Sequence, residues 1–546
     1  MGASESRQEA TQDVTKDLET TVATICHLPT LRDAFTRLCH GNNDHHPPPH
    51  SDDAILLQTL KDCFSFRFKK IESKSPTEDH FLNLLNNVGE AIVDLFFTCE
   101  NGQVSWIEFL KGYIRCCGRA PASESLCNLY KLHAEASRKA GMPSNLDFVS
   151  DSVDCRINGY FMLRDVLTLL WLCWIMMHDS RISKLEVVLA LPEVNHLLWS
   201  VILSNNDVGS EIKPMDQGNF DLSQQVSFDK LHKWALTVVP GLSNCFTQYV
   251  NDRMQTTNSV VQQAVLEPCT QSTSDCPPKE ENSSCLLTSG RAWSISLTLR
   301  NFFCEELMEA CVSGGILGTS ENLLYRSSIH GKGLNRFWSN IDGYQAPLLM
   351  LVAASTSDAH EDNISSRQWV IGVLVQQGFE NRDVYYGSPG FIYALHPSFH
   401  ASGWTGKEKN FVCSHLRATR RVYEANPRPV GIGFGGSIGN ERIFIDEDLA
   451  HITVRHHAFD KTYQPGFLVP NQGFLAVEGS VLDVEVWGLG GKSAKQGQDA
   501  YKKREGLFTE QRRKVDLKTF GNWEDSPEKM LLDMVSDPNK IQREER

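Results

Sequence analysis

The sequence predicts a multidomain protein in which an α-helical region is followed by an α+β domain. A chain of 546 residues is longer than one ordinary domain. Between residues 54 and 252, apolar residues recur at steps of three and four, as in "HFLNLLNNVGEAIVDLFF", which is typical of helices. After residue 290 the chain changes to short β-rich runs, such as "QWVIGVLVQQ" and "VLDVEVWGL", separated by Gly, Asn and Asp. This texture is typical of antiparallel sheets.

Bulk composition narrows the class of protein. Hydrophobic residues make up 41% and charged residues 22% of the chain, as in a soluble globular protein. The net charge of −14 argues against nucleic-acid binding, because such binding needs a basic surface that replaces phosphate counterions. The 16 cysteines have no C-x-x-C spacing and the first residues form no apolar leader. We therefore expect reduced thiols and a cytoplasmic location.

We expect a lipid anchor rather than a membrane-spanning helix. The most apolar run, "VLTLLWLCWIMM", is well short of the roughly 20 residues that a span needs, so we interpret it as a buried core helix. The first six residues, "MGASES", match the M-G-x-x-x-[ST] pattern in which Gly2 is myristoylated. An unmodified tail is the alternative. One acyl chain binds a membrane only marginally, so a second membrane signal is required.

The helical region contains a repeat that resembles EF-hands. "VSWIEFLKGY" and "VSFDKLHKWA" share a Val-Ser-aromatic start followed by an amphipathic helix. In the EF-hand loop pattern that precedes the first repeat, Gly102 and Glu108 fall at positions 6 and 12, but Phe97 and Cys99 occupy positions 1 and 3. These two side chains cannot bind a hard cation. The scaffold is therefore EF-hand-like and its calcium chemistry is largely lost.

A second loop, "DCRINGYFMLRD", fits the same pattern with one conflict. Asp154, Asn158, Gly159 and Asp165 match positions 1, 5, 6 and 12, whereas Arg156 places a positive charge at position 3. We predict no metal site at either loop, and a calcium-responsive sensor is the least favoured interpretation.

The segment "VGIGFGGSIGNERIFIDEDL" contains two enzyme motifs at once. Gly431, Gly433 and Gly436 match the dinucleotide fingerprint, and Ser437 lies in a G-x-S-x-G nucleophile motif. Both motifs require a strand that turns directly into a helix. Here the turn is followed by "ERIFID", which alternates as a strand does. We therefore predict a hairpin, with no catalytic residue and no bound cofactor.

These patterns divide the chain into five parts. They are an acylated N-terminus that is disordered or forms a short helix (1–53), an EF-hand-like helical domain (54–252), a Ser/Thr/Gln/Pro-rich linker (253–290), an α+β domain (291–491) and a basic C-terminal extension that ends in a helix (492–546).

The α+β domain resembles the TLDc (TBC/LysM-associated) domain in four ordered stretches. They begin with "LLYRSSIHGKGLNRFWSNIDGYQAPLLMLVAAS" and "WVIGVLVQQGFENRDVYYGSPGFIYAL", continue with the glycine-rich hairpin and close with "VLDVEVWGLGG". The acylation pattern, the helical region and the C-terminal extension together resemble the lysosomal, mTOR-associated subfamily of TLDc proteins.

This resemblance implies a sandwich of two antiparallel sheets flanked by helices, with no established catalysis. Family members protect cells from oxidative damage, and several bind the vacuolar proton-pumping ATPase. The lysosomal subfamily is tied to nutrient signalling through mTOR. We therefore expect a non-enzymatic adaptor that is peripheral to the lysosomal or vacuolar membrane and contacts it through its lipid. Its expected partners are this pump and components of the mTOR complex. An enzyme of oxidative-stress defence is the alternative.

Candidate partner-binding residues lie in the last strand and in the extension. Alternation places Glu485 on the face opposite Val484 and Val486, where a structural or docking carboxylate is favoured over a catalytic one, and Trp487 is either core or interface. Between Lys492 and Lys518, basic residues outnumber acidic ones by nine to four, so this segment fits an acidic surface or anionic lipid, or is simply a solvated helix. The extension supplies the remaining candidates, which are Lys502, Lys503, Arg504, Arg512, Arg513, Met530, Leu531 and Met534.

Overall fold

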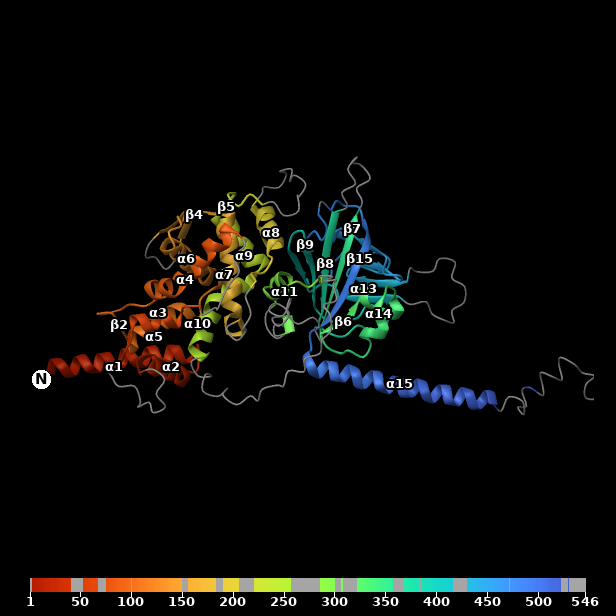
Figure 1. Ribbon diagram of the computed structural model, residues 1–546, viewed down its shortest axis with the longest axis horizontal. Helices are drawn as coiled ribbons and strands as arrows, with labels where there is room; N and C mark the ends of the chain where they lie inside the picture. Colours follow the sequence, from red (N-terminus) through yellow and green to blue (C-terminus); the bar gives the residue numbers. More distant parts are fainter. Residues whose placement is uncertain are drawn as a thin grey trace, which may run out of the picture.

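The computed structural model has a helical part and a sheet that lie side by side, with helix α11 (Ser289–Ser296) between them (Figure 1). The structure describes residues 2–40, 53–66, 75–99, 101–149, 156–182, 190–205, 220–256, 285–299, 306–307, 322–356, 367–382, 384–415, 430–470, 472–521 and 529.

The helical part confirms that the first half of the chain is rich in helices. Its elements are α1 (Gly2–Ala23), α2 (Leu28–His40), β1 (Ala54–Leu56), α3 (Leu57–Cys63), α4 (Pro76–Phe96), β2 (Gln103–Ser105), α5 (Trp106–Cys117), α6 (Ala122–Lys139), β3 (Leu146–Val149), β4 (Arg156–Met162), α7 (Leu163–Ile182), α8 (Asn195–Asn205), β5 (Gln225–Ser227), α9 (Phe228–Val238), η1 (Pro240–Asn244) and α10 (Cys245–Thr256).

The N-terminal segment is more ordered than the sequence predicts. Helix α1 is 22 residues long, and α2 buries Leu31 and Phe35 in the core of the helical part. Glu19 on α1 accepts a hydrogen bond from the indole of Trp106 at 2.9 Å, which ties α1 to α5. The periodicity of α2 explains its packing, because its apolar residues recur on one face.

Short strands join the helix pairs of this region. Strand β1 pairs with β2, and β4 pairs with β5, in both cases antiparallel. Strands β2 and β5 hold the repeated Val-Ser sequence, and each leads directly into a helix. The Ser105 hydroxyl accepts from the amide of Glu108 at 3.4 Å and so caps α5. The repeat is therefore a strand and a helix start.

The second loop with EF-hand spacing is a hairpin strand. Asn158 lies in β4 opposite Asp147 of β3, where a calcium loop would be coiled. The Asp165 carboxylate accepts from the amide of Met162 at 3.1 Å, so it caps the start of α7. Within the described ranges, no group of three His, Cys, Asp or Glu side chains is placed to hold a metal ion.

Helix α7 contains the most apolar run of the chain and is buried on almost every side. Leu170, Trp174 and Met176 are each 1% exposed, as expected for a core helix. Of the helices that the structure describes, none is long and apolar enough to cross a membrane.

The predicted linker is shorter than 253–290. Helix α10 continues to Thr256, and Leu287 is only 4% exposed just before α11 begins. The core of the helical part continues through α11, whose Trp293 and Ile295 are fully buried, into the outer face of the sheet.

The sheet is formed by the second half of the chain and confirms its α+β class. Its strands are β6 (Leu323–Arg326), β7 (Leu348–Thr356), β8 (Arg367–Val375), β9 (Phe391–His396), β10 (His400–Gly403), β11 (Val412–His415), β12 (Gly431–Phe434), β13 (Ile443–Asp446), β14 (His451–Val454) and β15 (Val477–Gly488), with the short helices α13 (Ser327–His330), α14 (Leu334–Ile341) and η2 (His457–Phe459) between them.

The expectation of two separate sheets is wrong in its connectivity. Hydrogen bonds join ten strands into one sheet in the order β10-β9-β8-β7-β15-β14-β13-β12-β11, with β6 also paired to β15. The 12-residue β15 pairs with β14 near its start and with β6 near its end. Met350 of β7 and Ile432 of β12 share one core, so this continuous sheet folds over on itself.

Strand β7 is buried on both faces, which explains its unbroken apolar run. Met350 and Val352 face the core inside the folded sheet, whereas Leu349 and Leu351 belong to the core shared with the helical part. Adjacent side chains of a strand point to opposite faces, so both faces of this strand are covered.

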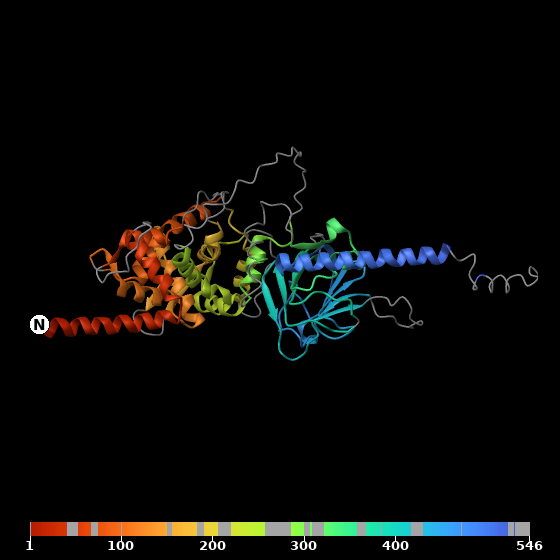
Figure 2. The ribbon, with the colours of Figure 1, turned by 90° about the horizontal axis from the view of Figure 1, so that it is seen from below.

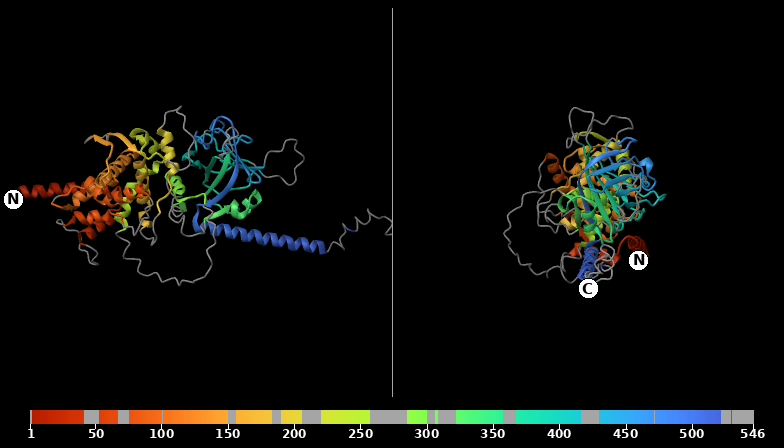
Figure 3. Two further views of the ribbon diagram at one scale, coloured as in Figure 1. Left: turned by 45° about the horizontal axis from the view of Figure 1, so that its top comes forward. Right: turned by 90° about the vertical axis from the view of Figure 1, so that its right-hand side faces the viewer.

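Two helices extend away from the body at its opposite ends (Figures 2 and 3). Helix α1 leaves the helical part, and the 31-residue α15 (Gly491–Gly521) leaves the underside of the sheet. Helix α15 therefore lies largely outside both cores.

Candidate functional site

Glu485 forms a fully buried junction between the sheet and the segment before α11. Its side chain is 0% exposed. One carboxylate oxygen accepts from the amide of Leu286 at 2.8 Å, and the other accepts from the amide of Leu287 at 3.2 Å. The indole of Trp487 donates to the same carboxylate at 2.9 Å. The carboxylate thus satisfies three donors that would otherwise be buried without partners.

The alternation predicted for β15 places this carboxylate. Val484 and Val486 face the core inside the folded sheet, and Trp487 faces the core shared with the helical part. Burial raises the pKa of Glu485, although the amide of Leu286, Trp487 and Arg326 oppose that shift. Glu485 and Trp487 were expected as partner-binding candidates. The structure corrects this, because both side chains are buried within the chain.

Arg326 adds a charge to this junction that the sequence analysis did not single out. Its guanidinium lies 3.4 Å from Glu485 and 3.0 Å from Asp483. The backbone amide of Ser328 also donates to Asp483, at 3.1 Å. Burial alone would raise the pKa of Asp483, but hydrogen bonds from Ser327, Arg326 and Ser328 lower it. Arg326 thus bridges two carboxylates and holds β6 against β15.

The glycine-rich segment is a hairpin, as predicted. Strands β12 and β13 pair antiparallel, and Gly435 and Gly436 both have φ of +68° in the turn. A Cβ on Gly436 would lie 2.2 Å from the carbonyl oxygen of Asn440, so the turn needs glycine there for space as well as for conformation. The glycines of this turn therefore allow close packing of the backbone.

Asp446 and His451 follow Ser437 in the Ser…Asp…His order of a hydrolase triad, but Ser437 does not lie beside them. Ser437 lies at the hairpin turn, whereas Asp446 lies at the far end of β13, opposite Gly431. Asp446 accepts from the exposed His451 at 3.1 Å. His456 caps the amide of Ala458 at 3.2 Å in a separate turn. Asp446, His456 and Glu485 therefore do not converge on one pocket.

A buried ion pair supports the hairpin from below. Arg442 and Asp460 are both fully buried, with 3.3 Å between their charged atoms. Asp460 also accepts from the amide of Gly436 at 2.9 Å, and a Cβ on Gly435 would lie 2.8 Å from the same carboxylate. The close approach of Asp460 is thus a second reason for glycine in this turn.

Comparison with known proteins agrees with this architecture. The family model of the TLDc domain matches residues 300–490. This segment therefore resembles a TLDc domain and is referred to by that name. Oxidation resistance protein 1 of Rattus norvegicus is 24% identical over 172 residues, and that of Bos taurus is 25% identical over 173 residues. Each match covers 31% of this chain, and it covers 17% of the rat protein and 16% of the bovine one. The chain thus matches less than a fifth of the length of these relatives.

Helix α15 leaves the TLDc domain through a few contacts at its start. The side-chain amide of Gln498 and the ammonium of Lys502 each donate to the carbonyl oxygen of Asn340, both at 2.8 Å. From Lys503 to Lys514 every side chain is exposed, including Arg504, Arg512 and Arg513. Leu507 and Phe508 are also exposed, at 53% and 64%. The predicted basic candidates thus lie on a helix that projects from its own domain.

The remaining predicted site residues lie near the two ends of the chain. Met530, Leu531 and Met534 lie outside the described residues. Gly2 is the first residue of α1.

Burial limits the reactivity of three described thiols, those of Cys116, Cys117 and Cys413, toward oxidants. Cys413 is buried in the TLDc domain. In the helical part, burial raises the pKa of Cys116 and of Cys117, which favours their neutral and unreactive form. Cys304 and Cys311 lie outside the described residues.

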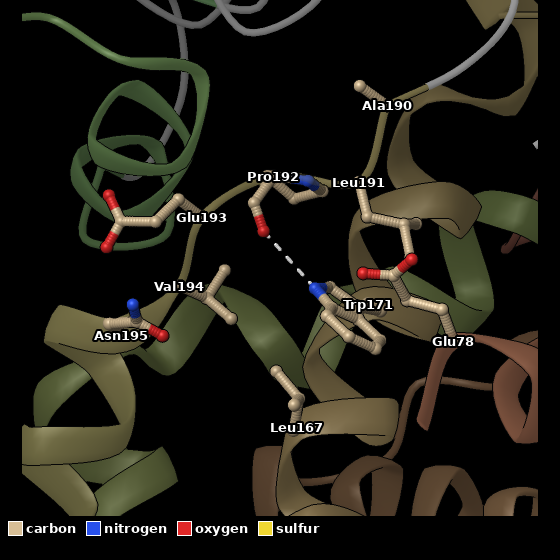
Figure 4. Close-up of a pocket in the computed structure, with 9 residues that line it drawn as sticks. All are labelled: Glu78, Leu167, Trp171, Ala190, Leu191, Pro192, Glu193, Val194 and Asn195. Carbon is tan, nitrogen blue, oxygen red and sulfur yellow. Dashed lines mark hydrogen bonds between the residues drawn. The ribbon is translucent and has the colours of Figure 1, made fainter. Parts of the chain in front are cut away.

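A small pocket lies in the helical part (Figure 4). It has a volume of about 240 Å³, and Trp171, Leu167 and Glu78 form one side of it. Residues 190–195 also line it, and the carbonyl of Pro192 accepts from the indole of Trp171 at 3.2 Å. Among the described residues, its lining contains the carboxylates of Glu78 and Glu193 but no His, Cys, Ser or Lys.

Proposed function

We propose that this protein is a non-enzymatic adaptor that binds the vacuolar proton-pumping ATPase at the lysosomal or vacuolar membrane. Its role would link the pump to nutrient signalling through mTOR and to resistance against oxidative stress. Support for the oxidative-stress link comes from the TLDc domain and from relatives named Oxidation resistance protein 1. Support for the pump and for mTOR comes from the resemblance of the whole chain to the lysosomal TLDc subfamily.

The exposed part of α15 is the observation that carries this proposal. A helix with no core of its own gains stability by packing against something else, and an isolated helix in water is only marginally stable. Residues 503–514 combine exposed cations with the apolar side chains of Leu507 and Phe508. Such a helix fits a partner surface that is acidic and has an apolar groove.

The helical part would then serve as a rigid scaffold and not as a calcium switch. We interpret the pairings β1 with β2 and β4 with β5 as the remains of paired EF-hands, because successive loops of EF-hands join through such short strands. Phe97, Cys99 and Arg156 occupy ligand positions and give no carboxylate for calcium. The shared core with α11 fixes this scaffold to the TLDc domain.

Membrane location would depend on Gly2 and on a second contact. A myristoyl chain at Gly2 would bind reversibly, with an association constant of about 10⁴ M⁻¹. The pump itself would supply the second contact through α15. This arrangement leaves the TLDc domain free of any catalytic duty, which agrees with the separate positions of Asp446, His456 and Glu485.

The proposal is tested by co-purification with detergent-solubilised vacuolar ATPase. The intact chain should be retained, and a version that ends at Gly491 should not, because it lacks α15. A version that ends at Gly506 is the matched control, since it keeps the contacts of Gln498 and Lys502 with Asn340 but loses the distal cations. Absence of the intact chain from the purified pump would reject the proposal, and the enzyme hypothesis would then be tested next.

A further inference from the structure

The TLDc domain has a group of exposed apolar side chains on the loops that follow β14. Phe459 is 46% exposed, Phe467 55%, Phe474 63% and Leu475 83%. These four residues and the adjacent His456 and His457 are called the aromatic lobe here. Large apolar side chains that gather on a surface mark an interaction site more often than scattered ones do.

The members of the aromatic lobe contact one another. The ring centres of His456 and His457 lie 3.9 Å apart, and those of His456 and Phe474 lie 5.0 Å apart. His457 lies 5.6 Å from Phe467, and Phe459 lies 5.3 Å from Phe474. The lobe is therefore one continuous surface and not a set of separate side chains.

A buried ion pair fixes the backbone beneath the lobe. Arg442 donates to the carbonyl oxygens of Gln464 and Gly466, at 2.8 Å in both cases. Asp460 accepts from the amide of Thr462, also at 2.8 Å. Both charged side chains are fully buried. The exposed rings are thus held in place before any partner binds, which lowers the entropic cost of binding.

Three lysines, together with Glu408, lie in the lobe segment or on a turn joined to it, although the chain as a whole has a net charge of −14. Lys461 lies within the lobe segment and is 72% exposed, 3.8 Å from Glu408. The turn that contains Lys407 and Lys409, both exposed, is joined to the lobe by the amide of Thr405, which donates to the carbonyl of Thr462 at 2.9 Å. Between Arg455 and Val477 the one acidic residue is the buried Asp460.

We propose that the aromatic lobe inserts into the headgroup region of a bilayer that contains anionic lipids. Exposed Phe and Leu side chains of peripheral segments are buried at the boundary of headgroups and acyl chains, and nearby lysines are attracted to anionic headgroups. A peptide partner would bind in a groove whose walls partly shield the side chains that contact the peptide. The side chains of the lobe instead stand exposed, at up to 83%. A soft bilayer accepts such protruding groups. This inference deepens the proposed function, on which it rests for the presence of a membrane, by naming a direct lipid contact in addition to Gly2 and to the pump.

Vesicle sedimentation of the full chain, made without an acyltransferase so that Gly2 is free, tests this inference. The vesicles contain phosphatidylcholine with or without phosphatidylserine. The lobe variant is Phe467→Ser, Phe474→Ser and Leu475→Ser together, and these side chains are exposed enough for the fold to tolerate the change. The matched control is Ile329→Ser with Val384→Ser, which are 65% and 62% exposed elsewhere on the TLDc domain. Helix α15 is present throughout, so its own lipid binding cancels in the comparison.

We expect the lobe variant to bind the anionic vesicles at least about tenfold more weakly than the parent chain, and the control to bind as the parent does. Reversal of Lys407, Lys409 and Lys461 to Glu should weaken binding by about fivefold per lysine. Equal binding by the lobe variant and the parent would overturn the inference. If the lobe variant lost its binding to the pump but kept its binding to vesicles, the inference would also be overturned, because the lobe would then dock a protein. If the parent chain did not bind the pump but bound vesicles through the lobe, the proposed function would fail and this inference would stand.

Discussion

The carboxylate of Glu485 accepts a hydrogen bond from the amide of Leu286 at 2.8 Å, across 199 positions of the sequence. This contact joins β15 of the TLDc domain to the chain that enters it from the helical part. It explains how a carboxylate can lie fully buried between Val484 and Val486. Its partners are backbone amides and an indole, which only an acceptor can satisfy.

Replacement of Glu485 by Ala should loosen the connection between the two parts of the chain. The amides of Leu286 and Leu287 would lose their acceptor, and Arg326 would lose one of its two carboxylates. We expect a loss of about 3–5 kcal/mol in the free energy of unfolding. The amide protons of Leu286 and Leu287 should also exchange faster. Glu478→Ala, at an exposed position of the same strand, is the control and should change stability by less than about 0.5 kcal/mol.

The pH dependence of stability should depend on the same carboxyl group. Burial raises the pKa of Glu485 from its ordinary value of 4.5. A raised pKa in the folded state means that this group contributes stability below pH 4.5 and loses that contribution as the pH rises through the folded pKa. The free energy of unfolding of the parent minus that of Glu485→Gln should therefore decrease from acidic to neutral pH. Chemical denaturation across this range measures it, and an increase would contradict the account.

The hairpin turn offers a matched pair of glycines. Gly436 and Gly439 both have positive φ, of +68° and +85°. A Cβ on Gly436 would lie 2.2 Å from the oxygen of Asn440, whereas one on Gly439 would meet nothing within 4 Å. Gly439→Ala should cost about 1–2 kcal/mol for the conformation alone. Gly436→Ala should cost about 1–3 kcal/mol more through steric conflict. Equal losses in thermal unfolding would show that space does not constrain the turn.

Membrane association should depend on the acyl chain at Gly2. Gly2→Ala removes the acceptor of myristate and should move the protein from the membrane fraction to the cytosolic fraction. Ala3→Ser is the control, because the pattern leaves that position open. An unchanged distribution of Gly2→Ala on fractionation would reject the lipid tether.

Much of the fold could be predicted from local sequence patterns. The alternation of Val484, Glu485 and Val486 gave the correct face for each side chain, and the turn after Gly436 was recognised as a hairpin because a strand followed it. The four ordered TLDc stretches located the domain itself, which the family comparison matches at residues 300–490. These features depend on neighbours in the chain, which a sequence displays directly.

The remainder depends on residues that are distant in the chain. That Glu485 meets Leu286, and that Arg442 meets Asp460 beneath the lobe, follows from tertiary packing that no local period reveals. Trp487 was open to either core or interface, and only the position of the helical part decides for the core. One signal was available for Arg442, since a charged residue at the start of an apolar strand requires a partner when it is buried.

In the proposed function, the distal cations of α15 dock the chain on the vacuolar ATPase. The most direct test of this docking is a binding titration with the purified cytosolic sector of the pump, using the full chain and a variant with Arg512, Arg513 and Lys514 changed to Glu. These side chains are exposed, so the variant should fold as the parent does. Lys407→Glu with Lys409→Glu is the control for a general loss of positive charge. We expect the dissociation constant of the α15 variant to be at least about tenfold higher than that of the parent chain, and that of the control to be unchanged. Equal affinity of the α15 variant and the parent would contradict this docking.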